Sequence, residues 1–276
     1  MKRILLIGAA CCLGLLIFIS VTSMPQHAAQ PPYPARSDEA TPPPFSPDPR
    51  GVAMAKLMAL NDFSGYLSGI KVVGDWSSVT PIDVRATASQ LYASYSANEV
   101  AADDKFKGKS IAVTGEIYQI SKNVFGSVYL VLNTGNEFAS VHATLADESA
   151  AQAAHLSKGV KITLICTGDG MLLMSPILKD CQTSEVTLGI KRPTIEKMID
   201  DLLAGEDGNL PKRTKALIGL SYVLGSLLPR GTDCETATPE NMDACTVALR
   251  KVPKSDWTPA YLELSKRIPI PPPLKK

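Results

Sequence analysis

The order of the periodic segments between residues 110 and 181 constrains the fold more than any other feature of this sequence. Alternation of apolar and polar residues predicts strands, whereas a period of 3.6 residues predicts helices. The predicted strands cover residues 110–120, 127–135, 138–146, 160–170 and 171–181, and a predicted helix at 147–157 separates the third from the fourth. Gly168, Asp169 and Gly170 predict the hairpin turn between the last two strands. Three strands, a helix and two strands are the order of a small closed barrel.

This strand order, together with a helix in front of it, predicts an OB-fold, a five-stranded barrel, at residues 87–190. The helix in front of the barrel is expected to begin at Thr87, which caps it, and to end near Gly108. Leu91, Tyr95 and Val100 are expected to face the core. Gly115, within the first strand, is the expected position of a β-bulge. The fold class predicted for the whole chain is α+β.

The segment at the start of the barrel resembles a known family. An N-E-x-x-A-D pattern formed by Asn98, Glu99, Ala102 and Asp103 is followed by a K-G-K step at 107–109. With GVKITLICTGDG and ILKDC further along, residues 95–185 resemble the bacterial tRNA_anti-like OB-fold family. The resemblance implies an exported or membrane-anchored module. It does not establish RNA binding, because one fold supports many functions.

Residues 1–23 predict either a signal-anchor or a cleaved signal peptide. Lys2 and Arg3 precede an apolar run of 18 residues at 4–21, close to the roughly 20 residues of a membrane-spanning helix. Small residues at 21–23 offer a cleavage site, which keeps the second interpretation open. The positive flank holds the N-terminus in the cytoplasm and sends the rest across. The predicted location is therefore the periplasm, anchored in the inner membrane or secreted after cleavage.

Two proline-rich stretches flank the part expected to fold. Residues 24–50 contain nine prolines and predict an extended linker, because proline runs favour polyproline II. Residues 269–276 predict a proline-rich tail. Between the linker and the barrel, residues 51–86 predict a short helix followed by an irregular segment.

Residues 191–268 predict a small helical unit. Its helices are expected at 194–205, 212–228 and 238–250, with a last one starting at Pro259, and Thr194 and Thr238 are the expected first residues of two of them. The IGLSYVLG helix and a cysteine-flanked turn faintly resemble the Rap1a/Tai-type periplasmic immunity proteins. That resemblance implies an alternative function, the neutralisation of a periplasmic toxin.

Four cysteines on the exported side predict two disulfide bonds. They are Cys166, Cys181, Cys234 and Cys245, an even number in a compartment that permits disulfides. Three pairings are possible for four cysteines. The simplest joins Cys166 to Cys181 and Cys234 to Cys245, because each bond then closes a short loop.

Aromatic and basic residues on the first three strands are the candidate ligand-binding residues: Tyr118, Lys122, Phe125, Tyr129, Phe138 and His142. The alternative interpretation is that the aromatic residues form the barrel core. A nucleic-acid site would need a basic groove as well as aromatic platforms. Between residues 105 and 185, seven lysines are balanced by seven acidic residues and arginine is absent. This charge balance disfavours nucleic acid.

The sequence contains none of the common catalytic or cofactor-binding motifs, and no metal or cofactor is expected. His142 and His155 have no adjacent acid or nucleophile in the sequence. The predicted function is therefore that of a non-catalytic, membrane-tethered periplasmic adaptor that uses its OB-fold to recognise an envelope protein. Single-stranded nucleic-acid binding is the second hypothesis.

Overall fold

The computed structural model describes residues 45–239 and 241–272. The predicted membrane segment at 4–21 and most of the proline-rich linker lie outside these residues, so the two interpretations of the N-terminus stay predictions. None of the helices in the described ranges combines the length and the hydropathy that a membrane span requires.

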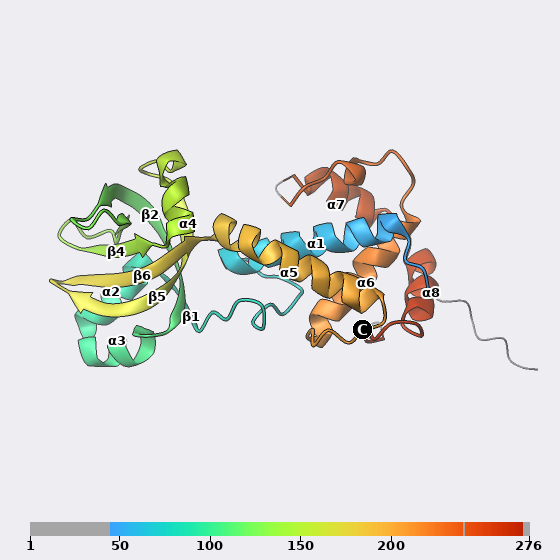
Figure 1. The fold of residues 1–276 in the computed structure, drawn as a ribbon, viewed down its shortest axis with the longest axis horizontal. Helices are drawn as coiled ribbons and strands as arrows, with labels where there is room; N and C mark the ends of the chain where they lie inside the picture. Colours follow the sequence, from blue (N-terminus) through green and yellow to red (C-terminus); the bar gives the residue numbers. More distant parts are fainter. Residues whose placement is uncertain (1–44, 240, 273–276) are drawn as a thin grey trace, which may run out of the picture. The chain divides into compact units, whose positions relative to one another are not determined.

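Five strands form the closed barrel that the sequence predicts (Figure 1): β2 (Ser110–Lys122), β3 (Val128–Asn133), β4 (Ser140–Leu145), β5 (Lys161–Leu172) and β6 (Ser175–Thr183). Antiparallel pairs join β2 to β3, β3 to β4, β5 to β6 and β2 to β5. The parallel pair of β4 and β6 completes the barrel. The helix between β4 and β5 is shorter than predicted, with α4 (Asp147–Gln152) continuing into the 3-10 turn η1 (Ala153–His155). A short strand that was not predicted, β1 (Val84–Thr87), pairs parallel with the start of β2.

The turn between β5 and β6 is not at Gly168–Gly170, as predicted, but at Leu173 and Met174. Gly168 is part of strand β5, and its N–H donates to the carbonyl of Lys109 at 3.0 Å. A Cβ atom at this position would lie 2.1 Å from the carbonyl oxygen of Phe106. This glycine is therefore required for close packing against the chain before β2, and not for a turn.

The β-bulge of strand β2 is also displaced from the predicted position. It lies between Ile117 and Gln119, and Gly115 is regularly paired. A Cβ at Gly115 would approach the side chains of Ala88 and Leu132 to 3.1 Å, so tight packing explains this glycine. Tyr118 follows the fully buried Ile117 and is exposed on the outside of the barrel, as the alternation of a strand requires.

Two helices stand where one was predicted in front of the barrel: α2 (Ala88–Ala97) and α3 (Glu99–Phe106). Thr87 caps α2 as expected, in a capping box with Gln90. Asn98 interrupts the helix because its side chain accepts a hydrogen bond from the N–H of Ala101 and so starts a new helix. The break turns Val100 to solvent, with 76% of its surface exposed, instead of toward the core as predicted.

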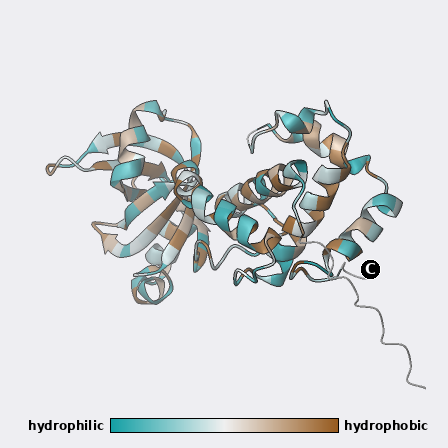
Figure 2. Ribbon diagram, turned by 45° about the vertical axis from the view of Figure 1, so that its right-hand side comes forward, coloured by the Kyte–Doolittle hydropathy of each residue, from teal (hydrophilic) through white to brown (hydrophobic). Residues whose placement is uncertain are grey.

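The helical unit contains α5 (Ser184–Leu203), α6 (Lys212–Leu227), α7 (Asp243–Arg250), α8 (Lys254–Leu264) and the 3-10 turn η2 (Asp233–Glu235). It also contains α1 (Pro49–Ser68), which precedes the barrel in the sequence and lies along α5 and α6 (Figure 1). Buried side chains of α1, including Phe63 and Leu67, share one core with Ile199 and Ile218. Figure 2 shows hydrophobic residues distributed along these helices and along the barrel strands.

Three helix starts in this unit differ from the predictions. Thr194 does not cap a helix, because α5 begins at Ser184, is capped by Thr183 and runs through Pro193. Thr238 lies outside a helix, and α7 begins only at Asp243. Pro259 lies within α8, which already begins at Lys254. In α5, buried residues on both sides of Pro193, such as Leu188 and Ile195, favour one continuous helix.

Candidate ligand-binding face of the barrel

A hollow of about 710 Å³ lies on the outer face of β2, β3 and β4, and we call it the barrel hollow. Its lining includes aromatic residues and uncharged polar residues: Tyr118, Gln119, Tyr129, Asn133, Asn136, Phe138, Ser140 and His142. The volume is within the range of roughly 300–1,000 Å³ that is typical of ligand sites. The face formed by the second and third strands of an OB-fold is where this fold commonly binds its ligands.

Strand register brings two rings of the barrel hollow together. Val131 of β3 stands opposite Gln119 of β2 and His142 of β4, and Tyr129 lies two residues away on the same face of β3. The rings of Tyr129 and His142 are stacked, with centroids 5.8 Å apart and an angle of 13° between their planes. Nε2 of His142 is hydrogen-bonded to the hydroxyl of Ser140 at 3.0 Å. These contacts hold both half-buried rings in place.

The loop between β3 and β4, residues 134–139, forms one wall of the barrel hollow and is held by its own side chains. The hydroxyl of Thr134 donates to the carbonyl of Ala139 at 2.7 Å. The side-chain oxygen of Asn133 accepts from the N–H of Gly135 at 2.8 Å, and that of Asn136 accepts from the N–H of Phe138 at 3.0 Å. The carbonyl oxygens of both amides are therefore used, and their NH₂ groups have no hydrogen-bond partner within the described part of the chain.

The barrel hollow has little charge. Glu137 is the one acidic residue of its described lining, and neither lysine nor arginine is among the lining residues. Burial lowers the pKa of His142 below its ordinary value of 6.5, because the charged imidazolium loses hydration. His142 is therefore neutral at neutral pH, and the hollow lacks the cations with which nucleic-acid sites neutralise phosphates.

Four of the six predicted site residues line the barrel hollow: Tyr118, Tyr129, Phe138 and His142. Lys122 and Phe125 do not; they lie at the end of β2 and in the turn to β3. Gln119, Asn133, Asn136 and Ser140 also line the hollow and were not predicted. Asn133 and Asn136 were visible as turn residues, but the bulge that places Gln119 on the face has no clear sequence signal.

A second surface, the apolar edge, consists of Phe138, Leu172, Leu173 and Met174. Leu173 and Phe138 are 90% and 91% exposed, and the other two side chains are also largely exposed. The parallel register of His142 with Ile177 places the loop before β4 beside the turn before β6, so the four residues lie at the same end of the barrel. The other exposed apolar turn, with Val124 and Phe125, lies at the opposite end of β3.

Leu173 and Met174 have backbone φ angles of 47° and 67°. They form a two-residue hairpin turn in which both residues are left-handed, the type I′ geometry that favours Asn-Gly. An L-residue other than glycine or asparagine pays roughly 1–2 kcal/mol to adopt this conformation. The turn therefore keeps two exposed apolar side chains in a conformation that favours other residues.

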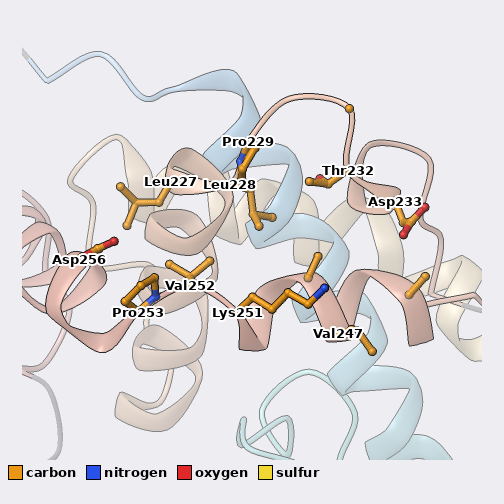
Figure 3. Close-up of a pocket in the computed structure, with 13 residues that line it drawn as sticks. Leu227, Leu228, Pro229, Thr232, Asp233, Val247, Lys251, Val252, Pro253 and Asp256 are labelled. Carbon is orange, nitrogen blue, oxygen red and sulfur yellow. The ribbon is translucent and has the colours of Figure 1, made fainter.

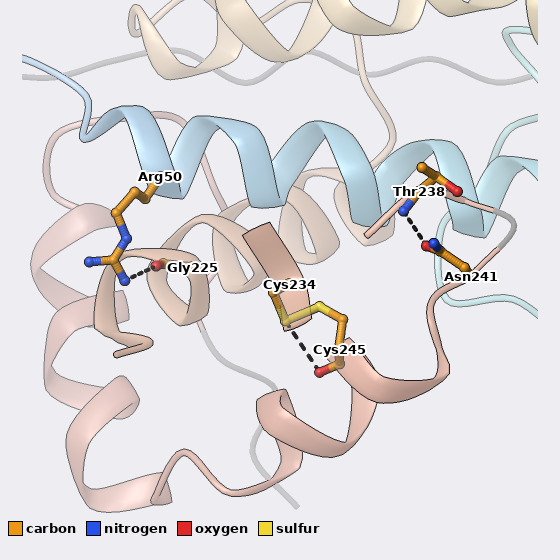
Figure 4. The surroundings of a disulfide bond; sticks show 6 residues. All are labelled: Arg50, Gly225, Cys234, Thr238, Asn241 and Cys245. Carbon is orange, nitrogen blue, oxygen red and sulfur yellow. Dashed lines mark hydrogen bonds between the residues drawn. A yellow bond between two sulfur atoms is a disulfide. The ribbon is translucent and has the colours of Figure 1, made fainter. Parts of the chain in front are cut away.

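Both predicted disulfides are present. Cys166 of β5 is bonded to Cys181 of β6, and Cys234 is bonded to Cys245 of α7. Figure 4 shows the second bond near Arg50, whose guanidinium donates to the carbonyl of Gly225 at 3.2 Å. Two disulfides are typical of proteins from outside the reducing cytoplasm.

The helical unit has a hollow of its own, of about 520 Å³, between the end of α6, α7 and the start of α8 (Figure 3). Apolar side chains such as Leu227, Val247 and Val252 line it, with Asp233, Lys251 and Asp256 among them. Within the described residues, no group of three or more His, Cys, Asp and Glu side chains is placed to hold a metal ion.

A sequence model of the tRNA_anti-like family matches residues 4–182, well over half of the chain. The chain belongs to the tRNA_anti-like family. The OB-fold of this family is a fold of the nucleic-acid-binding type. The family match ends before residues 191–268, so the resemblance of that part to immunity proteins stays a prediction.

Solved structures that are similar to this tRNA_anti-like protein include the following two. One is a protein from Klebsiella pneumoniae, provisionally named a nucleic acid-binding lipoprotein, with 18% identity and a TM-score of 0.32, covering 39% of this chain and 95% of the other. The second, from Leishmania major, is provisionally named an aspartyl-tRNA synthetase, with 12% identity and a TM-score of 0.26, covering 36% of this chain and 20% of the other. A search of curated proteins finds no match.

Proposed function

We propose that this tRNA_anti-like protein is a non-catalytic adaptor of the periplasm, tethered to the inner membrane, which recognises an envelope protein through its barrel. The apolar edge is the proposed contact surface. Disulfides and the apolar run at 4–21 support the location. The observation that carries the proposal is the turn of Leu173 and Met174, which holds exposed apolar side chains in a left-handed backbone.

The barrel itself does not require these two residues. A two-residue type I′ turn is most stable as Asn-Gly, and neither side chain contributes to the buried core of the barrel. Strained residues that the fold does not need are characteristic of functional sites. Clustered exposed apolar residues are characteristic of protein contact surfaces. Both properties meet at the apolar edge.

Single-stranded nucleic acid is the second candidate ligand, favoured by the stacked rings of Tyr129 and His142. Stacking platforms bind bases in many OB-folds. The phosphates of a bound strand would, however, meet Glu137 and no lysine or arginine in the lining of the barrel hollow. The charge of the site therefore favours the protein adaptor.

Photo-crosslinking in living cells tests the proposal. A photo-crosslinking amino acid replaces Leu172 in the full-length chain, and the matched control replaces Val124, which is 94% exposed at the opposite end of β3. We expect one discrete protein adduct from position 172 and none from position 124. Mass spectrometry of the adduct identifies the partner.

The double variant Leu173→Asn with Met174→Gly separates the contact from the fold. We expect it to abolish the adduct while raising the free energy of unfolding by about 1–2 kcal/mol, because Asn and Gly adopt the left-handed turn at lower cost. Urea unfolding of the purified variant measures the stability. Equal adducts at positions 172 and 124, or an adduct that survives the double variant, would disprove the adaptor contact.

A further inference from the structure

We propose that the barrel hollow binds a neutral oligosaccharide. This goes beyond the adaptor function and rests on different residues, since the apolar edge lies beside the hollow and shares only Phe138 with it. An adaptor with both surfaces would connect an envelope protein to a glycan.

The aromatic rings of the barrel hollow match the apolar faces of sugar rings. One face of a pyranose carries mainly C–H groups, and this face packs on flat aromatic rings. A branched aliphatic side chain does not offer such a flat surface. Tyr129 and His142 present such flat surfaces, held parallel by their stacking. Tyr118 and Phe138 are exposed and stand on the same face, so a chain of more than one sugar has a second platform.

Planar polar side chains of the hollow match the rims of sugar rings, where hydroxyl groups both donate and accept hydrogen bonds. The amide NH₂ groups of Asn133 and Asn136 are available as donors, because only their oxygens are used within the loop. Gln119 donates through Nε2 to Ser121 at 2.6 Å, which leaves its carbonyl oxygen as an acceptor. The hollow therefore offers hydrogen-bond donors and acceptors as well as aromatic surfaces.

The charge of the lining selects against other ligands of OB-folds. A phosphodiester chain needs lysine or arginine, and the lining offers only Glu137. A neutral sugar has no charge to neutralise, and a carboxylate is a strong acceptor for its hydroxyl groups. The composition of the site thus fits an uncharged polyhydroxylated ligand.

The hollow is also organised before any ligand arrives. Hydrogen bonds of Thr134, Asn133 and Asn136 fix the loop at 134–139, and the Ser140 contact fixes His142. Rigid sites lose less conformational entropy on binding. This matters for a sugar, whose own hydroxyl groups must give up water on entering the site.

Isothermal titration calorimetry with the full chain, in a detergent without a sugar headgroup, tests the inference. The probes are a tetramer of N-acetylglucosamine, cellotetraose and a thymidine oligonucleotide, and the two sugars distinguish recognition of the acetamido group from recognition of the pyranose ring alone. We expect at least one sugar to bind, with a Kd that changes less than about twofold between ~0.05 and ~0.5 M salt.

Variants locate the binding. Tyr118→Ala removes an exposed side chain without emptying the core, and Tyr129→Leu keeps an apolar side chain but removes a flat ring; we expect each to weaken sugar binding about tenfold or more. Phe125→Ala, an exposed aromatic outside the hollow, is the matched control and leaves the Kd unchanged.

Three results would overturn the inference: no binding of either sugar, equal weakening by Phe125→Ala, or binding of the oligonucleotide alone that weakens with salt and with Tyr118→Ala. The adaptor proposal can fail separately. Leu173→Asn with Met174→Gly should leave sugar binding intact, and Tyr118→Ala should leave the crosslink at position 172 intact.

Discussion

His142 shows how one residue sets the electrostatics of the barrel hollow. Its half-buried ring is stacked on Tyr129 and hydrogen-bonded to Ser140, and none of the acidic side chains that the structure describes is hydrogen-bonded to it. Desolvation therefore lowers the pKa of His142 below 6.5 without a compensating carboxylate. The imidazole stays neutral at neutral pH, which preserves a flat, uncharged surface in the hollow.

This lowered pKa predicts a loss of stability in acid. Below about pH 6.5 the unfolded chain binds a proton at His142, whereas the folded chain does so only at lower pH. The free energy of unfolding therefore falls as the pH drops from 6.5 through the folded pKa. Above 6.5 the ring is neutral in both states and this loss is absent. NMR titration of the His142 ring should give a midpoint below 6.5. Urea unfolding at about pH 7.5 and about pH 5 should show a smaller acid loss for His142→Gln than for the unchanged protein. A midpoint at or above the ordinary value would contradict the argument.

At the scale of elements, glycines show where strands and helices approach one another closely. Gly168 lies in β5 where the carbonyl of Phe106, the last residue of α3, leaves no room for a side chain. Gly189 lies within α5, where a Cβ atom would meet nothing within 4 Å. The same residue type is thus required by packing at one position and costs helix stability at the other.

The two glycines give opposite predictions for the same substitution. Gly168→Ala should lower the free energy of unfolding by about 1–3 kcal/mol or more, because α3 and β5 must move apart. Gly189→Ala should raise it by about 0.5–1 kcal/mol, since alanine loses less backbone entropy in a helix. Urea unfolding of both variants measures the difference. Tolerance of alanine at Gly168 would show that the close contact with Phe106 is not required.

At the scale of the whole molecule, the two cores differ in how much of the chain they need. All residues of the barrel core come from one continuous stretch, with buried members from Ala88 to Cys181. The core of the helical unit combines α1 and Trp76 with α5, α6 and α8, so it needs residues from both sides of the barrel. The chain leaves the core of the helical unit after Val79 and returns to it through α5.

Fragments should therefore behave differently. Residues 84–183 are expected to fold alone, because they contain every member of the barrel core. Residues 184–272 are expected to remain largely unfolded, because they lack Phe63, Leu67 and Trp76, and to gain helix when a peptide of residues 45–82 is added. Circular dichroism of the fragments, separately and mixed, measures this. A cooperatively folded fragment 184–272 would contradict the shared core.

Local signals in the sequence were sufficient for the barrel and for much of its ligand face. Alternation identified all five strands within a few residues, because one side of each strand must be apolar. The aromatic residues Tyr118, Tyr129, Phe138 and His142 could be selected because they fall on the first three strands. Local signals failed where a glycine serves packing, as at Gly168, or where Asn98 divides one helix into two.

The periodicity of the chain and the spacing of its cysteines were enough to predict an OB-fold with two local disulfides, because both depend on residues close in the sequence. Only the tertiary structure decided that α1 belongs to the same core as α5 and α6, that Gln119 joins the barrel hollow, and that the turn of Leu173 and Met174 lies at the same end of the barrel as Phe138. Each of these depends on contacts between residues far apart in the chain. Such contacts are stabilised by the burial of side chains and by strand register, and a local sequence pattern does not reveal either.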